Sequence, residues 1–287
     1  MLLGRLLGFT IGTIDRIAYG AAKLMGEPQA KVWQGTMDKL DEMIEQDRLR
    51  VIHLGSFTRS LMRSMELSML WGVKDLLARP LLDLGCGDGL FSALLLPHIE
   101  AGIDLDGQVL EKVRPLGVYQ ELKQADATKH IPFNNAHFGA ILANSVVEHI
   151  PDTEALLKEA SRVLAPGGVF VFTTYTDDFT RYLEHFFGPK EAARINERIY
   201  HTSLYPAEKW PRMLEENNLE MIECRRYLPY QTVVMYRLFN SALFKLIEFS
   251  LKKYLWRLSR DRFCRLIRDS IYLGEEGCGM LIVAKKR

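Results

Sequence analysis

The chain has 287 residues, with 37 lysines and arginines against 36 aspartates and glutamates, and 48% of it is hydrophobic. This length and composition suit one domain with appendages or two small domains, and they allow a full hydrophobic core. A formal charge of +1 excludes attraction to nucleic acid or acidic partners by net charge alone.

The cysteines and the N-terminal residues indicate the cellular compartment. Cys86, Cys224, Cys264 and Cys278 form no C-x-x-C pair and have no histidine cluster nearby in sequence, so we expect no disulfide framework and no zinc site. The apolar stretch 6–14 lacks a clean cleavage pattern and is shorter than the roughly 20 apolar residues of a membrane span. These features predict a cytoplasmic protein in a reducing compartment.

The predicted elements change character near residue 80. Residues 1–75 have helical apolar spacing, with a break at Pro28 and a third helix over 60–77. After that, short apolar runs alternate with helical patterns, which predicts a parallel sheet with helices on both faces. The predicted strands are 80–85, 98–104, 119–126, 138–144, 168–175, 218–228 and 277–286, and helices at 90–96, 107–113 and 152–165 separate the earlier ones.

We therefore expect three segments. A helical N-terminal cap covers residues 1–75, a core covers 76–228 with 275–287, and a helical insertion covers 229–274. The insertion combines an apolar stripe at helical spacing with eight basic residues. Such a helix either docks on the core with its basic face in water or lies on an anionic membrane surface.

The sequence LLDLGCGDG at residues 81–89 sets three glycines directly after an apolar strand. A glycine-rich turn at the carboxyl end of a parallel strand lets backbone N–H groups approach a ligand without a Cβ in the way. Asp83 lies inside that strand, where a carboxylate is costly unless it is paired or meets a cationic ligand. Asp104 closes the next strand, where it can accept hydrogen bonds from ribose hydroxyls, and Asp126 follows the third strand within reach of an adenine amino group.

Four segments together resemble the class I S-adenosylmethionine (SAM)-dependent methyltransferases, in particular the type 11 branch that includes ubiquinone and menaquinone biosynthesis enzymes. They are LDLGCGDG, GIDLD, ADATKHIPFNNAHFGAILANSVVEHIPD and EASRVLAPGGVFVFTT, within residues 80–175. The resemblance implies a Rossmann-like, seven-stranded, mostly parallel sheet and the cofactor SAM, which leaves as S-adenosylhomocysteine. For the glycine turn alone, a nicotinamide cofactor is the alternative.

The resemblance also implies which residues bind SAM. It assigns the methionine end to the glycine loop and to the end of the fourth strand, the ribose to Asp104, and the adenine to the residues after the second and third strands. The implied binding residues are Asp83, Gly85, Cys86, Gly87, Gly89, Asp104, Leu105, Asp126, Ala127, Asn144 and Ser145.

Catalytic residues are harder to read, because the methyl carbon of a sulfonium is already electrophilic. Alignment supplies much of the rate, and no metal is expected. His149 is the first candidate for a base, since it follows the fourth strand and histidine titrates near neutral pH. Glu148, His201 and Tyr205 are further candidates for the acceptor site. Each of these four residues also has a plain packing or hydrogen-bonding alternative.

We expect a methyltransferase for a small or amphiphilic acceptor, with O-methylation slightly favoured over C- or N-methylation. His53, Arg59 and Arg63 of the cap are weaker candidates for contacts with SAM or the acceptor, and residues 1–25 and 237–273 are candidates for peripheral membrane contact. Two alternatives stay open: an RNA methyltransferase whose basic insertion binds phosphates, and a non-catalytic SAM-binding regulatory protein.

Overall fold

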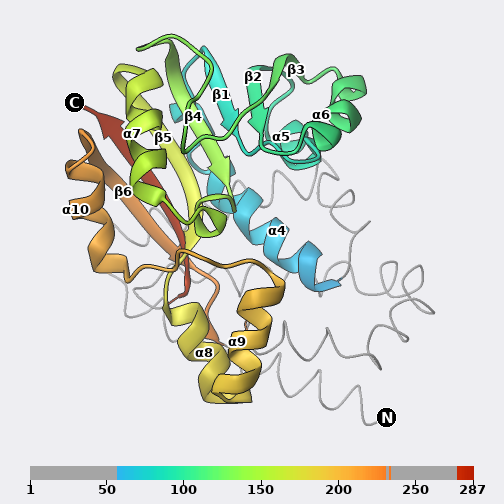
Figure 1. The fold of residues 1–287 in the computed structure, drawn as a ribbon, viewed down its shortest axis with the longest axis vertical. Helices are drawn as coiled ribbons and strands as arrows, with labels where there is room; N and C mark the ends of the chain where they lie inside the picture. Colours follow the sequence, from blue (N-terminus) through green and yellow to red (C-terminus); the bar gives the residue numbers. More distant parts are fainter. Residues whose placement is uncertain (1–56, 231–232, 234–276) are drawn as a thin grey trace. The chain divides into compact units, whose positions relative to one another are not determined.

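The computed structural model describes residues 57–230, 233 and 277–287 (Figure 1). The chain divides into two compact units, and the unit formed by residues 69–226 with 278–287 contains the predicted SAM and catalytic residues. Most of the predicted cap and insertion lies outside the described residues. So do His53, the side chain of Arg59, and nearly all of the segments considered for membrane contact. The three predicted domain boundaries therefore stay predictions.

A seven-stranded sheet with the order β3-β2-β1-β4-β5-β7-β6 organises this unit (Figure 1). The first five strands run parallel to their neighbours, and β7 is antiparallel to β5. The prediction of a Rossmann-like, mostly parallel sheet is confirmed. The strands are β1 (Leu81–Leu84), β2 (Ile99–Asp104), β3 (Tyr119–Gln124), β4 (Phe138–Asn144), β5 (Leu164–Tyr175), β6 (Leu219–Tyr227) and β7 (Gly279–Lys286).

The helices begin and end at recognisable residues. Asp106 caps α6 by accepting from the Gln108 N–H at 2.8 Å, and Asp152 caps α7 by accepting from the Ala155 N–H at 2.9 Å. Gly72 follows α4, so that helix ends at Trp71 instead of continuing to the predicted residue 77. The helices are α4 (Phe57–Trp71), α5 (Leu90–Leu95), α6 (Gly107–Val113), α7 (Thr153–Val163), α8 (Asp178–Phe187), α9 (Pro189–Arg198) and α10 (Trp210–Glu215).

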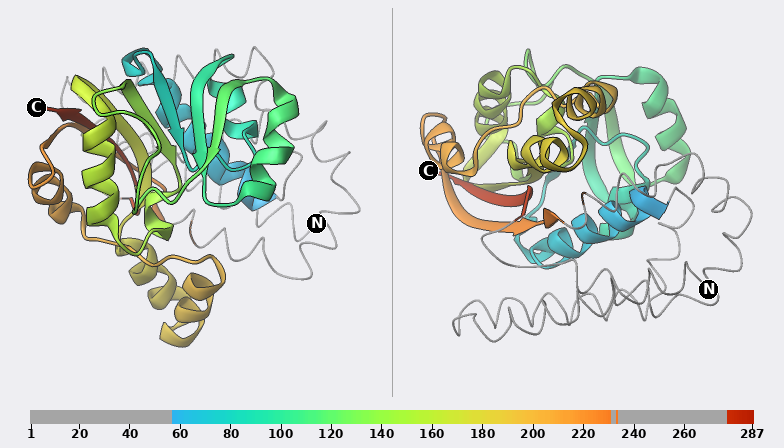
Figure 2. Two further views of the ribbon diagram at one scale, coloured as in Figure 1. Left: turned by 45° about the horizontal axis from the view of Figure 1, so that its top comes forward. Right: turned by 90° about the horizontal axis from the view of Figure 1, so that it is seen from below.

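Side chains alternate between the two faces of the sheet, whose strands are seen from two directions in Figure 2. One face buries Leu82 and Phe172 in a core cluster with apolar residues of α7 and α10, including Trp210. The next residue along β1, Asp83, points to the other face, where its Oδ2 accepts a hydrogen bond from the Tyr119 hydroxyl. Strands β1 and β4 are almost continuously apolar because both of their faces are covered.

Two features differ from the sequence-based expectation. Helices α8 and α9, which are joined by a hydrogen bond from Asn196 Nδ2 to Thr180 Oγ1 at 2.8 Å, were not predicted. The Pro-Gly-Gly sequence at 166–168 separates the predicted helix 152–165 from the predicted strand 168–175, but it lies within the bounds of β5. There the pairing with β4 shifts from Phe138–Leu164 to Ala140–Val169, so the three residues form an irregularity in the strand.

The connection between β6 and β7 leaves and returns at neighbouring strands of the sheet. At its ends, Gly277 lies against the backbone of Tyr227, where a Cβ built on the glycine would stand 2.5 Å from the Tyr227 carbonyl oxygen. Only glycine fits so close to another backbone. Within the described part of the chain, no helix has the length and apolar content needed to cross a membrane.

Candidate SAM-binding and acceptor site

The predicted SAM residues converge because β1 to β4 are parallel and adjacent. All four strands end at the same edge of the sheet. The strand order switches sides at β1, because β2 and β3 lie on one side of it and β4 lies on the other. Ligands of open α/β sheets bind at such a switch point. Asp104 and Asn144 end β2 and β4, the glycine loop and Asp126 follow β1 and β3, and all four therefore meet along one edge.

The three loop positions require glycine for different physical reasons. A Cβ on Gly85 would lie 2.6 Å from Cγ2 of Val146, and one on Gly89 would lie 2.8 Å from Cγ1 of Val113. These two positions are therefore set by packing within the protein. A Cβ on Gly87, at φ +52°, would meet no heavy atom closer than 4.0 Å. Gly87 is the glycine that leaves open space for a ligand.

Asp104 connects the loop to β2. Its Oδ2 accepts from the Gly87 N–H at 2.9 Å, and its Oδ1 accepts from the Asp106 N–H at 2.9 Å. A carboxylate offers about four acceptor positions, so lone pairs remain for ribose hydroxyls. Leu105, directly after Asp104, is 68% exposed, which leaves an apolar surface beside the carboxylate.

The residues after β3 and β4 are held by local hydrogen bonds. Asp126 Oδ1 accepts from the N–H and the hydroxyl of Thr128, and these bonds lower the pKa of Asp126. Ala127 packs on the core cluster. The Thr173 hydroxyl accepts from the Ser145 N–H at 2.9 Å and donates to Asn144 Oδ1 at 2.8 Å. Thr173 thus fixes the end of β4, although no sequence pattern singled it out.

Asp83 precedes the glycine loop in β1, and Cys86 belongs to the loop. The Asp83 carboxyl is 2% exposed, and burial raises its pKa to about 6 against hydrogen bonds from Ser92 and Tyr119 that lower it. Burial also raises the pKa of the Cys86 thiol, so this residue is a neutral thiol at physiological pH. Among the described residues, Cys86, Cys224 and Cys278 form no disulfide.

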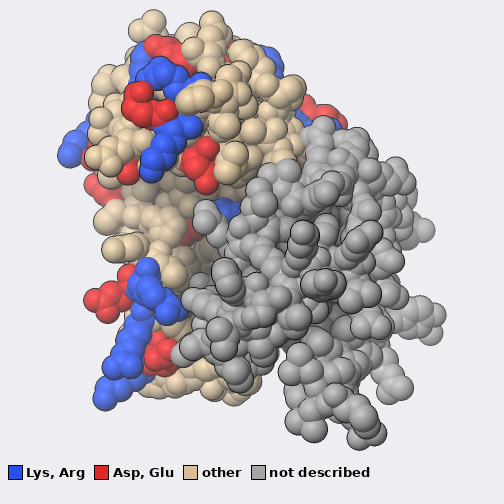
Figure 3. Space-filling model, turned by 90° about the vertical axis from the view of Figure 1, so that its right-hand side faces the viewer, with Lys and Arg blue, Asp and Glu red and all other residues tan. Residues whose placement is uncertain are grey.

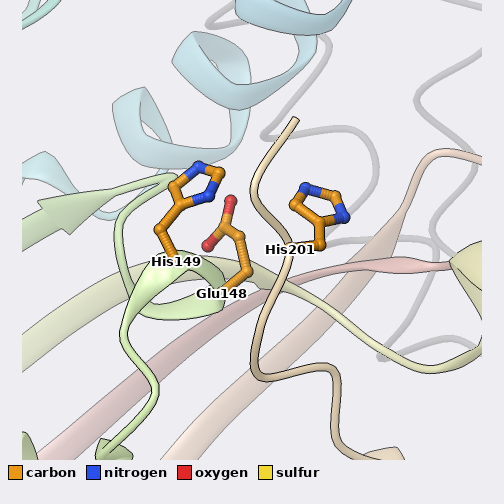
Figure 4. A group of neighbouring side chains, drawn as sticks. All are labelled: Glu148, His149 and His201. Carbon is orange, nitrogen blue, oxygen red and sulfur yellow. The ribbon is translucent and has the colours of Figure 1, made fainter. Parts of the chain in front are cut away.

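Glu148, His149 and His201 form a cluster beside the end of β4, which we call the acceptor cluster. Figure 4 shows the Glu148 carboxylate between the two imidazole rings, which come from the β4–α7 connection and from the segment after α9. One ligand atom of each residue lies within 4.8 Å of the others. The Glu148 carbonyl accepts from the N–H groups of Thr202 and Ser203 at 2.9 and 3.1 Å, which ties the two segments together.

The orientation of His149 selects its tautomer. Its Nδ1 lies 2.9 Å from the carbonyl oxygen of Tyr200, and the ring is exposed. A carbonyl oxygen only accepts hydrogen bonds, so Nδ1 carries the proton and Nε2 of the neutral ring keeps its lone pair. This is the arrangement that a histidine base requires.

His201 has a different environment. Its ring stacks on Tyr175 at a centroid distance of 5.3 Å, lies edge-on to Phe179, and stands 5.5 Å from the ring of His149. Burial, followed by repulsion from His149, lowers the pKa of His201 from 6.5 to about 3. His201 is therefore neutral at physiological pH and does not act as a second positive charge.

Tyr205 and Arg63 have other contacts. Tyr205 packs edge-on against Trp210, and the Lys209 ammonium lies over its ring at 4.1 Å, which gives Tyr205 a packing role in this structure. Arg63 is paired with Glu66 within α4, at 2.6 Å. A groove of about 670 Å³ beside α6 is lined by residues such as Asp106 and Gln124, none of which is among the predicted SAM residues.

Comparison with known proteins identifies the domain. Residues 82–172 match the family described as Methyltransferase domain. This part of the chain is similar to a methyltransferase domain, and the sheet has the fold of a SAM-dependent methyltransferase of known structure. The ubiquinone biosynthesis O-methyltransferase of Coxiella burnetii is 29% identical over 107 residues, which make up 36% of this chain and 46% of that protein. The chain thus spans less than half the length of this relative.

Two further proteins match longer parts of the chain. An uncharacterized methyltransferase of Mycobacterium tuberculosis is 29% identical over 140 residues, which cover 45% of this chain and 68% of that protein. The crystal structure of a SAM-dependent methyltransferase from Thermotoga maritima is 18% identical, with a TM-score of 0.53, and covers 89% of this chain and 100% of its own. The predicted class I, type 11 resemblance and its fold are confirmed.

The packing reason assigned to Gly85 predicts a stability effect that differs from that of Gly87. We expect Gly85→Ala to lower the free energy of unfolding by about 2–4 kcal/mol, from overpacking against Val146 and from the left-handed backbone. Gly87→Ala carries only the backbone cost of about 1–2 kcal/mol. Urea unfolding of both variants, and of Gly85→Ala combined with Val146→Ala, measures the difference. The combined variant should recover part of the loss, and equal losses for the two alanines would contradict the assignment.

The low pKa of His201 predicts a pH dependence of stability. Below about pH 6.5 the unfolded chain protonates His201, whereas the folded protein keeps it neutral down to about pH 3. The free energy of unfolding therefore falls as the pH drops through this window. We expect wild type to lose about 1–2 kcal/mol more than His201→Phe between pH 7 and pH 5. Denaturant titrations at both pH values test this, and parallel losses in the two proteins would refute it.

Proposed function

We propose that this chain is a SAM-dependent methyltransferase that methylates a hydroxyl oxygen of a small or amphiphilic acceptor. The observation that carries the proposal is the hydrogen bond from the Gly87 N–H to Asp104 Oδ2, beside open space over Gly87. It lies at the switch point of the sheet and within the segment that matches the methyltransferase family.

The residues at this edge fit SAM on structural grounds. Gly87 has no Cβ where a ligand would lie, Asp104 keeps free acceptor positions for ribose hydroxyls, and exposed Leu105 offers an apolar face for adenine. Asp83 places negative charge beneath the loop, near the methionine end of a cationic cofactor. Asp126 and Ala127 then belong to the adenine end, and Asn144 and Ser145 to the methionine end. When bound, SAM supplies the electrophilic methyl carbon.

We assign proton removal from the acceptor hydroxyl to His149. The Tyr200 carbonyl holds the Nδ1 proton, so the lone pair of Nε2 is free to take the hydroxyl proton. His201 stays neutral, and therefore does not oppose the positive charge that His149 acquires. Buried Glu148, between the two rings, is suited to favour that charge (Figure 4). O-methylation is supported by the name of the Coxiella burnetii relative.

The RNA methyltransferase alternative receives less support from the described surface. Figure 3 shows basic and acidic side chains lying beside one another on the described part of that face, where an RNA-binding surface would gather positive charge. The basic residues of the predicted insertion lie outside the described residues.

The cofactor assignment predicts a selective loss of binding. We expect the full chain to bind SAM and S-adenosylhomocysteine in calorimetry, and Asp104→Ala to weaken SAM binding at least tenfold, because the loop anchor and the ribose acceptor are both lost. Glu111→Ala, an exposed carboxylate on α6 that pairs only with Arg114 in the described structure, is the control and should bind like wild type. Absence of SAM binding by wild type would overturn the proposed function.

The base assignment predicts a loss of turnover without a loss of affinity. His149→Ala should slow formation of S-adenosylhomocysteine by about 10²–10⁴-fold with phenolic or other hydroxyl acceptors, while the Kd for SAM stays unchanged. Because the acceptor cluster also has ligand types that hold divalent metals, turnover is measured with and without EDTA. We expect equal rates. A loss of activity in EDTA that added metal restores would replace the base role by a metal-assisted one.

A further inference from the structure

A hydrogen-bonded cluster lies under the glycine loop, on the sheet face away from the main core cluster. The Tyr119 hydroxyl, at the start of β3, donates to Asp83 Oδ2 of β1 with an O···O distance of 2.5 Å. The Ser92 hydroxyl of α5 also favours the ionised form of Asp83 and lowers its pKa. Asp83 is 2% exposed and Ser92 is 4% exposed, so the carboxylate depends on these donors in place of water.

Two glycines make room for the tyrosine ring. A Cβ on Gly102 of β2, the strand between β1 and β3, would lie 2.9 Å from Cδ1 of Tyr119. A Cβ on Gly89, the last glycine of the loop, would lie 3.1 Å from Cε2 of the same ring. The ring thus crosses β2 to reach Asp83 and supports the loop from below.

The groups that face Asp83 set its charge. Asp104 at the end of β2 raises the pKa of Asp83, as burial does, while the hydrogen bonds from Ser92 and Tyr119 lower it. The Cys86 thiol of the loop also faces Asp83, and the pKa of this thiol is raised. Burial and Asp83 raise the pKa of Tyr119 as well, so its hydroxyl remains a proton donor. Together, these opposing effects on its pKa leave Asp83 ionised at neutral pH and protonated in mild acid.

We propose that Tyr119 is a positioning residue for cofactor binding, which holds Asp83 as a carboxylate beneath the loop so that its negative charge favours a cationic ligand there. The proposal rests on the proposed function, because SAM is the cation in question. Tyr119 acts through Asp83 and does not itself contact the ligand in this proposal. It favours the ionised form of Asp83, and the charge of Asp83 then acts on the ligand through space, because electrostatic interactions are strong in a poorly solvated site.

The sign of the pH effect follows from the ionisation of Asp83. With a pKa of about 6, the free protein loses this charge as the pH falls below 6, and the affinity for a cation falls with it. Removal of the Tyr119 hydroxyl takes away a donor that favours the carboxylate. In Tyr119→Phe the loss of affinity should therefore begin at a higher pH than in wild type.

The test is calorimetric titration of the full chain with SAM between pH 5.5 and 7.5. We expect the Kd of wild type to be about fourfold weaker at pH 5.5 than at pH 7.5, and that of Tyr119→Phe more than tenfold weaker. Asp83→Asn is the matched control. It should bind weakly with a flat profile, and adding Tyr119→Phe to it should leave the profile flat. Ser92→Ala, which removes the other donor, should shift the profile in the same direction and replaces Tyr119→Phe if that variant does not fold.

Each outcome decides one proposal. If wild type binds SAM with a flat pH profile, or if Tyr119→Phe weakens binding equally at every pH in both backgrounds, Tyr119 has only a packing role and the inference is wrong. The proposed function survives either result. If wild type does not bind SAM at any pH, the proposed function itself fails.

Discussion

Three consecutive backbone N–H groups of the glycine loop are bound to the end of β2. Those of Gly85 and Cys86 donate to the Ile103 carbonyl at 2.8 and 3.0 Å, and that of Gly87 donates to the Asp104 carboxylate at 2.9 Å. The parallel register, in which Leu84 is opposite Ile103, makes these bonds possible. A loop fixed in this way reaches the ligand already ordered, so less conformational entropy is lost on binding.

The acceptor side depends on a backbone connection of another kind. The N–H groups of Thr202 and Ser203 donate hydrogen bonds to the carbonyl of Glu148, although more than 50 residues separate the two segments along the chain. The Tyr200 carbonyl beside them orients His149. The segment after α9 thus holds both the main chain of Glu148 and the ring of His149, and α7, β5, α8 and α9 lie between the two segments along the chain.

The strands and the glycine loop were predictable because their information is local. Buried parallel strands are continuous apolar runs, and glycine density marks a turn. Helices α8 and α9 were missed, although Gly188 before Pro189 marks a helix boundary that could have been read. The pairs Asp83–Tyr119 and His149–His201 could not be predicted, because they join residues 36 and 52 positions apart through strand order and loop path. The irregularity at Pro-Gly-Gly likewise depends on pairing with β4.

The close approach of Gly277 to Tyr227 has a consequence for how such a protein can change over evolution. Because β6 and β7 are neighbours, whatever sequence joins them starts and finishes at nearly the same point of the sheet. A segment whose two ends lie side by side can be lengthened, shortened or replaced as a unit while the strands on either side keep their register. Changes in that segment can therefore accumulate without altering the glycine loop, which follows a different strand of the sheet.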